Sequence, residues 1–233
     1  TGDVSKDDPR NQDEIGEKEI LVVSFGTSYN DSRAKDIGGI EAYLAKEFPD
    51  YSVRRAFTSQ IILNHILARD GEKIDNVEQA LERAKKNGVK ELIVQPTHLM
   101  KGKEYDELKE TLDKHKASFE KLELAEPLLG EVGKDAEDVN ADKERVANLI
   151  VQATVTGGGF DSVQKAAQDG VAFVFLGHGT SHTAAISYSE MQSAMKKLGY
   201  ANVFIGTVEG EPEETAVGAV IDAVKKGGYK KVT

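Results

Sequence analysis

Short apolar runs alternate with amphipathic stretches along most of the chain. The runs carry Val, Ile, Leu and Phe at consecutive positions, which is typical of strands that are buried on both faces of a sheet. Such strands are predicted at residues 20–25, 92–94, 171–176 and 203–205, with weaker candidates at 52–57 and 122–125.

Between these runs, apolar positions recur with the spacing of a helix. Ile37, Ile40 and Leu44 fall on one face of the first predicted helix, and a later helix over 77–84 closes at Asn87-Gly88 as a helix C-terminus would. Further helices are predicted at 61–69, 103–116, 141–153, 188–198 and 213–226. Strands that alternate with helices predict an α/β fold with parallel sheets flanked by helices.

Two of the predicted strands end in nearly the same way. The first reads ILVVSFGTS and the second FVFLGHGTS, so His178 stands where the first copy has Phe25. Another pair, NGVKELIVQPTHLMKG and GGYKKVT, extends the similarity to the last residues. The repeat predicts two similar lobes, each with its own parallel sheet, and chemistry that is asymmetric because only one copy carries an imidazole.

The domain organisation follows from this repeat. Residues 1–18 are polar and lack a strand or helix period, so we expect a flexible leader. The first lobe is expected at 19–135 and the second at 136–233, with a hinge near the acidic, glycine-containing stretch 130–142. Because a strand pattern has only just begun at KKVT, we expect the second lobe to be incomplete.

Composition narrows the possible partners. The 233 residues carry a net charge of −10, which disfavours nucleic acid and anionic membranes. The absence of cysteine excludes disulfides, thiolate metal sites and a cysteine nucleophile, but it is compatible with a cytoplasmic or an extracytoplasmic location. No apolar stretch has the length of about 20 residues that a transmembrane helix needs. The oligomeric state, including a homo-oligomer, is left open.

Candidate chemistry gathers where predicted strands end. In open parallel sheets, ligands bind outside the carboxyl ends of the strands. His98, His178 and Glu209 each follow a predicted strand directly, and His178 is flanked by Gly177 and Gly179. These residues are therefore the first candidates for a functional site.

Several of these motifs together resemble a known family, the class II anaerobic cobaltochelatases. The resemblance rests on LVVSFGTSYNDSR, RAFTSQIIL, THLMKGKEYDEL, FLGHGTSH and GTVEGEPE, which occur in the family's order. Members of this family insert cobalt into sirohydrochlorin during cobalamin biosynthesis. The resemblance implies a chelatase-like fold, a tetrapyrrole substrate, Co²⁺ as the substrate metal and no organic cofactor.

The resemblance also implies the metal ligands. In the family, the metal is held by a histidine of the glycine-flanked turn, a glutamate at a strand end of the second half, and a histidine on a later loop. The first two fall on His178 and Glu209, which are therefore the predicted catalytic and metal-binding residues. The third would fall after Thr233.

These residue types suit metal insertion. The reaction strips water from a divalent ion and removes two pyrrole N–H protons, so its ligands must select the metal and yet release it. Imidazole with carboxylate suits Co²⁺, Ni²⁺ or Fe²⁺. A neutral imidazole also accepts a proton near neutral pH, so His178 is a candidate for both ligand and base. Gly177 and Gly179 would let a flat macrocycle approach the backbone closely.

Further residues are candidates for substrate binding. The substrate carries carboxylates, which Lys101, Lys103, Arg54 and Arg55 could pair with near the strand ends of the first lobe. His98 is expected to contact the macrocycle or a proton. The complete predicted set of substrate-binding residues is Ser24, Gly26, Thr27, Ser28, Tyr29, His98, Lys101, Gly177, Gly179 and His182.

Structural roles are alternatives for several of these residues. Glu209 stands before a predicted helix, where an acid favours the positive end. His182 is better placed to support the ligands than to bind metal itself. His65 and His115 lie in amphipathic helical patterns, which favours structural roles for both.

Other classes of function fit less well. A serine hydrolase would need a G-x-S-x-G elbow, and a nucleotide-binding enzyme would need a G-x-G-x-x-G or P-loop motif, but the chain has neither pattern. A noncatalytic carrier of metal or tetrapyrrole remains the main alternative.

Overall fold

The computed structural model describes residues 2–233 and divides them into two compact units. The first unit comprises the described chain up to His98 together with Glu104–Pro127, and the second comprises Leu99–Lys103 and Leu128–Thr233. The division at Pro127 lies before the predicted boundary at residues 135 and 136, and the short segment Leu99–Lys103 joins the second unit.

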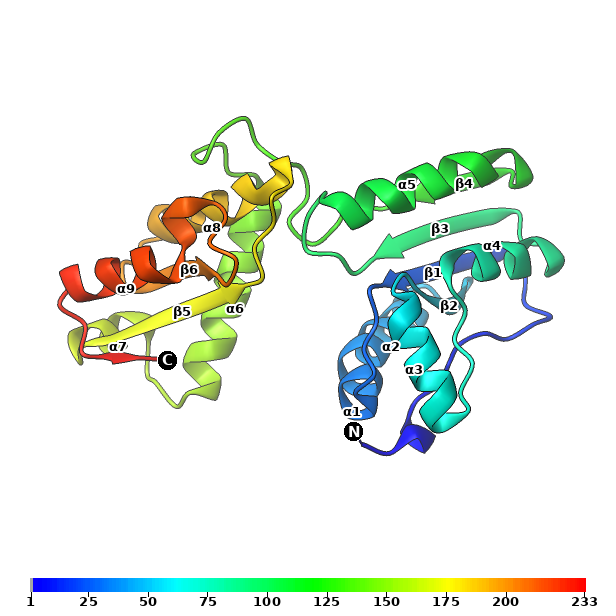
Figure 1. The fold of residues 1–233 in the computed structure, drawn as a ribbon, viewed down its shortest axis with the longest axis horizontal. Helices are drawn as coiled ribbons and strands as arrows, with labels where there is room; N and C mark the ends of the chain where they lie inside the picture. Colours follow the sequence, from blue (N-terminus) through cyan, green and yellow to red (C-terminus); the bar gives the residue numbers. More distant parts are fainter. Residues whose placement is uncertain (1) are drawn as a thin grey trace. The chain divides into compact units, whose positions relative to one another are not determined.

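The first unit is built on a four-stranded parallel sheet with the strand order β2-β1-β3-β4 (Figure 1). These strands span Lys18–Ser24 (β1), Ser52–Phe57 (β2), Glu91–Pro96 (β3) and Lys121–Leu124 (β4). The weaker strand predictions at 52–57 and 122–125 are thus confirmed along with those at 20–25 and 92–94.

Helices cover both faces of this sheet because successive residues of β1 are apolar on both sides. Leu21 and Val23 pack against α4 and α5, where they meet Leu81 and Leu108. Ile20 and Val22 of β1 pack with Leu44 of α2 on the other face. The helices of this unit are α1 (Asn30–Ser32), α2 (Gly38–Glu47), α3 (Gln60–Asp70), α4 (Val77–Lys86) and α5 (Lys103–His115), with a π-helical segment (Arg33–Ile37) before α2 and 3₁₀ turns at Val4–Lys6 and Lys116–Ser118.

The second unit repeats the plan with a three-stranded parallel sheet of order β6-β5-β7. Its central strand β5 (Val171–Gly177) lies between β6 (Val203–Thr207) and β7 (Lys231–Val232), as β1 lies between β2 and β3 in the first unit. The prediction of two similar lobes with parallel sheets is therefore confirmed.

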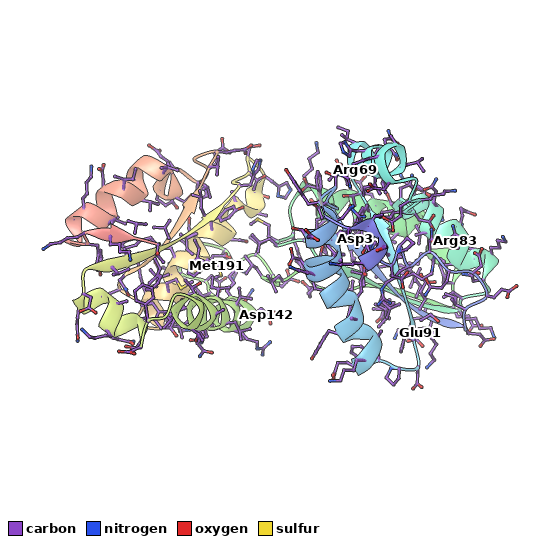
Figure 2. The ribbon with its side chains drawn as sticks, turned by 90° about the horizontal axis from the view of Figure 1, so that it is seen from below. Asp3, Arg69, Arg83, Glu91, Asp142 and Met191 are labelled. Atoms are coloured by element: carbon purple, nitrogen blue, oxygen red, sulfur yellow. The ribbon has the colours of Figure 1, made fainter. Side chains whose placement is uncertain are left out.

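The second unit also has helices on both faces of its sheet. The larger core lies between the sheet and helices α6 and α8 and includes Phe173 and Met191, the latter labelled in Figure 2. The other face packs on α9 through Ala172 and Val220. The helices are α6 (Ala141–Gly157), α7 (Val163–Gln168), α8 (Ile186–Lys197) and α9 (Val217–Lys226), with 3₁₀ turns at Thr183–Ala185 (η4) and Glu213–Thr215 (η5).

The segment before β1, for which we predicted a flexible leader, packs against the first unit. Asp7 is almost fully buried, and its carboxylate accepts hydrogen bonds from Arg33 at 2.5 Å and from Arg55 at 2.7 Å. The backbone carbonyl of Arg10 accepts a hydrogen bond from the N–H of Arg55 in β2. The segment packs against the first unit because the buried guanidinium groups of Arg33 and Arg55 require carboxylate partners, and Asp7 supplies one of them.

The two arginines that we considered for substrate carboxylates are buried, which corrects that prediction. Arg54 is paired with Glu19 at 2.7 Å, and both side chains are fully buried. Arg55 donates to both Asp7 and Glu41. Burial raises the pKa of Glu41, while Arg55 opposes that shift. These charges compensate one another in the interior of the first unit and do not face solvent.

Candidate metal site at the ends of β5 and β6

His178 and Glu209 are brought together by two adjacent parallel strands. Gly177 at the end of β5 is in register with Thr207 at the end of β6. The backbone pairing continues one step beyond the sheet, because the N–H of Glu209 donates to the carbonyl of His178 at 2.9 Å. The two side chains consequently meet, with 3.0 Å between His178 Nε2 and Glu209 Oε1.

The pair is open to solvent. The side chain of His178 is 79% exposed and that of Glu209 is 50% exposed. An imidazole nitrogen and a carboxylate oxygen that are adjacent and accessible form a ligand pair suited to a divalent transition metal. Such an exposed pair can receive an ion from solution and release it.

The glycines on both sides of His178 are required by close contacts. Gly179 has φ of +93°, and a Cβ on it would lie 3.1 Å from the Cβ of Glu209. A Cβ on Gly177 would lie 2.4 Å from Cε1 of Tyr188. A side chain at either position would therefore displace a residue that shapes the site.

The segment that carries Glu209 is closed by buried hydroxyl groups. Thr207 and Thr215 are joined by a hydrogen bond of 2.8 Å between their Oγ1 atoms, and Thr215 Oγ1 also donates to the carbonyl of Pro212. Glu209 lies within this closed segment and pairs with His178, whereas Glu213 and Glu214 occupy the first turn of η5. The contact with His178 thus favours the metal role of Glu209 over the helix-end alternative.

His182 has a local role in the chain turn after His178. Its Nδ1 accepts a hydrogen bond from the backbone N–H of Ala184 at 3.1 Å, so it caps the turn η4. Its own N–H donates to Thr180 Oγ1. This arrangement agrees with the idea that His182 supports the turn from outside the ligand pair.

The glycine turn at the end of β1 forms a second group of predicted residues. Ser24 is buried, and its hydroxyl accepts a hydrogen bond from Thr97 Oγ1 at 2.8 Å. Gly26 has φ of +100°, with the ring of Phe57 in the place of a Cβ. Thr27 Oγ1 accepts from the N–H of Tyr29, whose ring is exposed. Tyr29 is exposed, while Thr27 and Ser28 are each partly buried.

His98 and Lys101 follow β3 but differ in surroundings. His98 belongs to the first unit, and neither of its buried ring nitrogens has a hydrogen-bond partner among residues 2–233. Burial lowers the pKa of His98, with a smaller opposing effect from Glu104. Lys101 belongs to the second unit, where its Nζ lies 2.5 Å from Glu131 Oε1.

The predicted residues thus separate into two sets. Lys101, Gly177, His178, Gly179, His182 and Glu209 belong to the second unit, while the residues from Ser24 to Tyr29 and His98 belong to the first. Sequence reasoning missed Tyr188 of α8, which contacts the turn around His178. No pattern in the sequence indicates this contact, because it depends on how α8 packs against β5.

Within residues 2–233, no cluster of three or more His, Cys, Asp or Glu side chains that could hold a metal ion is found. In the same part of the chain, no helix combines the length and the apolar character needed to cross a membrane.

Comparisons with known proteins identify the family of this chain. The model of the family described as cobalt chelatase (CbiK) matches residues 18–233. A protein of Salmonella typhimurium named sirohydrochlorin cobaltochelatase is 31% identical over 215 residues, which cover 92% of this chain and 73% of the relative. A protein of Nitratidesulfovibrio vulgaris named sirohydrochlorin cobaltochelatase CbiKC is 28% identical over 217 residues, covering 92% of this chain and 69% of the relative.

Proposed function

Since the chain belongs to the cobalt chelatase (CbiK) family, we propose that it inserts Co²⁺ into sirohydrochlorin and that His178 and Glu209 hold the ion before transfer. The reaction is that of a metal chelatase, a lyase of the cobalamin pathway. The observation that carries the residue assignment is the accessible pair of His178 Nε2 and Glu209 Oε1, 3.0 Å apart, at the ends of adjacent strands.

The ligand set explains how the ion is held and released. One imidazole nitrogen and one carboxylate oxygen leave further coordination positions of Co²⁺ to water. The four pyrrole nitrogens of the substrate can then replace water and protein ligands one after another. Thiolate ligands would hold the ion more tightly and slow this exchange.

The same two residues suit the proton balance of the reaction. Insertion of Co²⁺ releases two N–H protons from the macrocycle, and the ion leaves His178 and Glu209 at the same time. The imidazole is then free to accept one proton, and the adjacent carboxylate can pass the other to water. Their exposure to solvent allows both groups to return the protons and bind a new ion.

The choice of metal depends on more than these ligands. Imidazole and carboxylate accept Ni²⁺ and Fe²⁺ as well as Co²⁺. The family name supports Co²⁺ as the substrate metal. We propose that Ni²⁺ and Fe²⁺ bind at the same pair, so each should compete with Co²⁺ for insertion.

We further propose that exposed groups in the turn after β1 bind substrate carboxylates. Ser28 and Tyr29 carry hydroxyls that solvent reaches. By contrast, the buried hydrogen bond between Ser24 and Thr97 favours a structural role for Ser24, and Gly26 shapes the turn beside Phe57.

Metal insertion can be measured directly by the change in visible absorption when Co²⁺ enters sirohydrochlorin. The His178→Ala and Glu209→Gln variants are expected to lose roughly 100-fold or more in rate, the scale of a lost proton acceptor or ligand. His65→Ala and Glu213→Gln are matched controls, since both residues are exposed and lie outside the pair. Full insertion activity in His178→Ala would refute the assignment of His178. A noncatalytic carrier would bind Co²⁺ and sirohydrochlorin without inserting the metal.

A further inference from the structure

Tyr188 contacts the glycines on both sides of His178. Its hydroxyl accepts a hydrogen bond from the backbone N–H of Gly179 at 3.2 Å. The edge of its ring lies so close to Gly177 that a Cβ there would be 2.4 Å from Cε1. Tyr188 is buried near the start of α8, so its position is set by the core of the second unit.

The turn is restrained from two sides, by β6 and by α8. Glycine has the greatest backbone freedom of any residue, and His178 lies between two of them with its own side chain largely exposed. The β6 side supplies backbone hydrogen bonds from Val208 and Glu209 to the carbonyls of Gly177 and His178. Tyr188 of α8 supports the turn from the other side, where its hydroxyl accepts a hydrogen bond from the backbone N–H of Gly179.

We propose that Tyr188 is a positioning residue for metal transfer, which holds the turn so that His178 Nε2 stays beside Glu209. The inference rests on the proposed function of this pair. Tyr188 does not itself touch the ion, because its hydroxyl is engaged with Gly179 inside the protein. Metal-binding groups work only when they are held to within about 0.5 Å of the required geometry, and residues behind them provide that restraint.

A purely structural role is the competing explanation, since Tyr188 also belongs to the main core of the second unit. The Tyr188→Phe variant separates the two, because it keeps the ring in the core and removes only the hydrogen bond to Gly179. Tyr200→Phe is the matched control. The hydroxyl of Tyr200 donates to Asn148 at 2.7 Å, and its ring packs against the same core.

Each variant loses one hydrogen bond, so both should lower the unfolding midpoint by a similar amount. Tyr188→Phe should in addition weaken Co²⁺ binding and lower kcat by about threefold to tenfold, the scale of one hydrogen bond, with KM for sirohydrochlorin unchanged. Tyr200→Phe should leave all three parameters at the wild-type values. Equal metal affinity and kcat in the two variants would overturn the proposal.

A second measurement does not depend on catalysis. Hydrogen exchange at the Gly179 amide, observed by NMR in the metal-free protein, should accelerate in Tyr188→Phe and not in Tyr200→Phe. Unchanged exchange at Gly179 would show that Tyr188 does not restrain the turn. If wild-type protein failed to insert Co²⁺, the proposed function would fall, while faster exchange at Gly179 in Tyr188→Phe would still establish the restraint.

A double-mutant cycle tests the ring contact. Gly177→Ala should impair Co²⁺ binding in the wild-type background, where the new methyl group meets the Tyr188 ring. In a Tyr188→Leu background the added damage should be smaller, because the smaller side chain leaves room. Equal damage in the two backgrounds would show that the ring does not fix the position of Gly177.

Discussion

His178 and Glu209 are paired twice, once through their backbones and once through their side chains. The N–H of Glu209 donates to the carbonyl of His178 at 2.9 Å, and the side-chain atoms Nε2 and Oε1 lie 3.0 Å apart. The backbone pairing continues the ladder between β5 and β6. Any change that separates the two strand ends should therefore separate the two ligands.

Gly179→Ala is the most direct change of this kind. It would place a methyl group 3.1 Å from the Cβ of Glu209 and force a positive φ on alanine. Gly199→Ala is the matched control, because Gly199 has φ of +80° and no atom near its missing Cβ. Both variants should lose about 1 kcal/mol of stability from the backbone strain.

Only Gly179→Ala is expected to weaken Co²⁺ binding, which calorimetric titration would measure for both proteins. Equal affinity in the two variants would mean that contact with Glu209 does not matter for the metal.

Thr215→Val tests the closure of the segment that carries Glu209. The substitution leaves the Thr207 hydroxyl and the Pro212 carbonyl without their buried partner. We expect a loss of about 1–3 kcal/mol in the free energy of unfolding, together with weaker Co²⁺ binding. Thr111→Val, on the exposed side of α5, removes a hydroxyl that donates to the carbonyl of Glu107 and should change neither. Urea unfolding and metal titration of both variants provide the measurement.

Asp7→Asn tests whether the segment before β1 is part of the first unit. Asp7 is shared between Arg33 and Arg55, and all three side chains are buried. Removing its charge leaves guanidinium groups under-compensated in the interior, which should lower the unfolding free energy by about 3 kcal/mol. Asp13→Asn is the control, since Asp13 pairs with Arg83 at the surface, where an ion pair contributes little to stability. Similar unfolding curves for the two variants would argue against a buried role for Asp7.

His98 should make the stability of the protein depend on pH. Burial lowers its pKa in the folded state below the ordinary value of 6.5, so the unfolded chain binds a proton more readily. The contribution of neutral His98 is full above pH 6.5 and is lost as the pH falls through that value toward the folded pKa.

Replacing His98 with Leu should therefore flatten the decline in stability between pH 7.5 and pH 5.5, measured by urea unfolding. His65→Leu is the control, because His65 is exposed on α3. A decline of unchanged steepness in His98→Leu would contradict the burial argument.

The sequence predicted the architecture well because β1 and β5 carry runs of consecutive apolar residues, as expected of strands that are covered on both faces. The repeat ILVVSFGTS and FVFLGHGTS corresponds in the structure to β1 and β5, each an interior strand of its sheet. The helix α7 was missed because it has only six residues, too few to show a helical period. The last predicted helix begins later than expected, since η5 precedes α9.

The sequence also predicted the meeting of His178 and Glu209, because both follow strands and parallel neighbours end at the same edge. It failed for Arg54 and Arg55, whose carboxylate partners come from distant parts of the chain. Their pairing with Glu19 and with Asp7 and Glu41 depends on tertiary packing that no local pattern records. The contact of Tyr188 with the turn around His178 could not be predicted for the same reason.

The central claim is that His178 and Glu209 bind the ion that is inserted. X-ray absorption spectroscopy of the protein loaded with one equivalent of Co²⁺ tests it most directly, since imidazole coordination has a recognisable scattering pattern. We predict imidazole scattering in the wild-type protein and in the His65→Ala control, and its loss in His178→Ala. Undiminished imidazole scattering from Co²⁺ bound to His178→Ala would contradict the account.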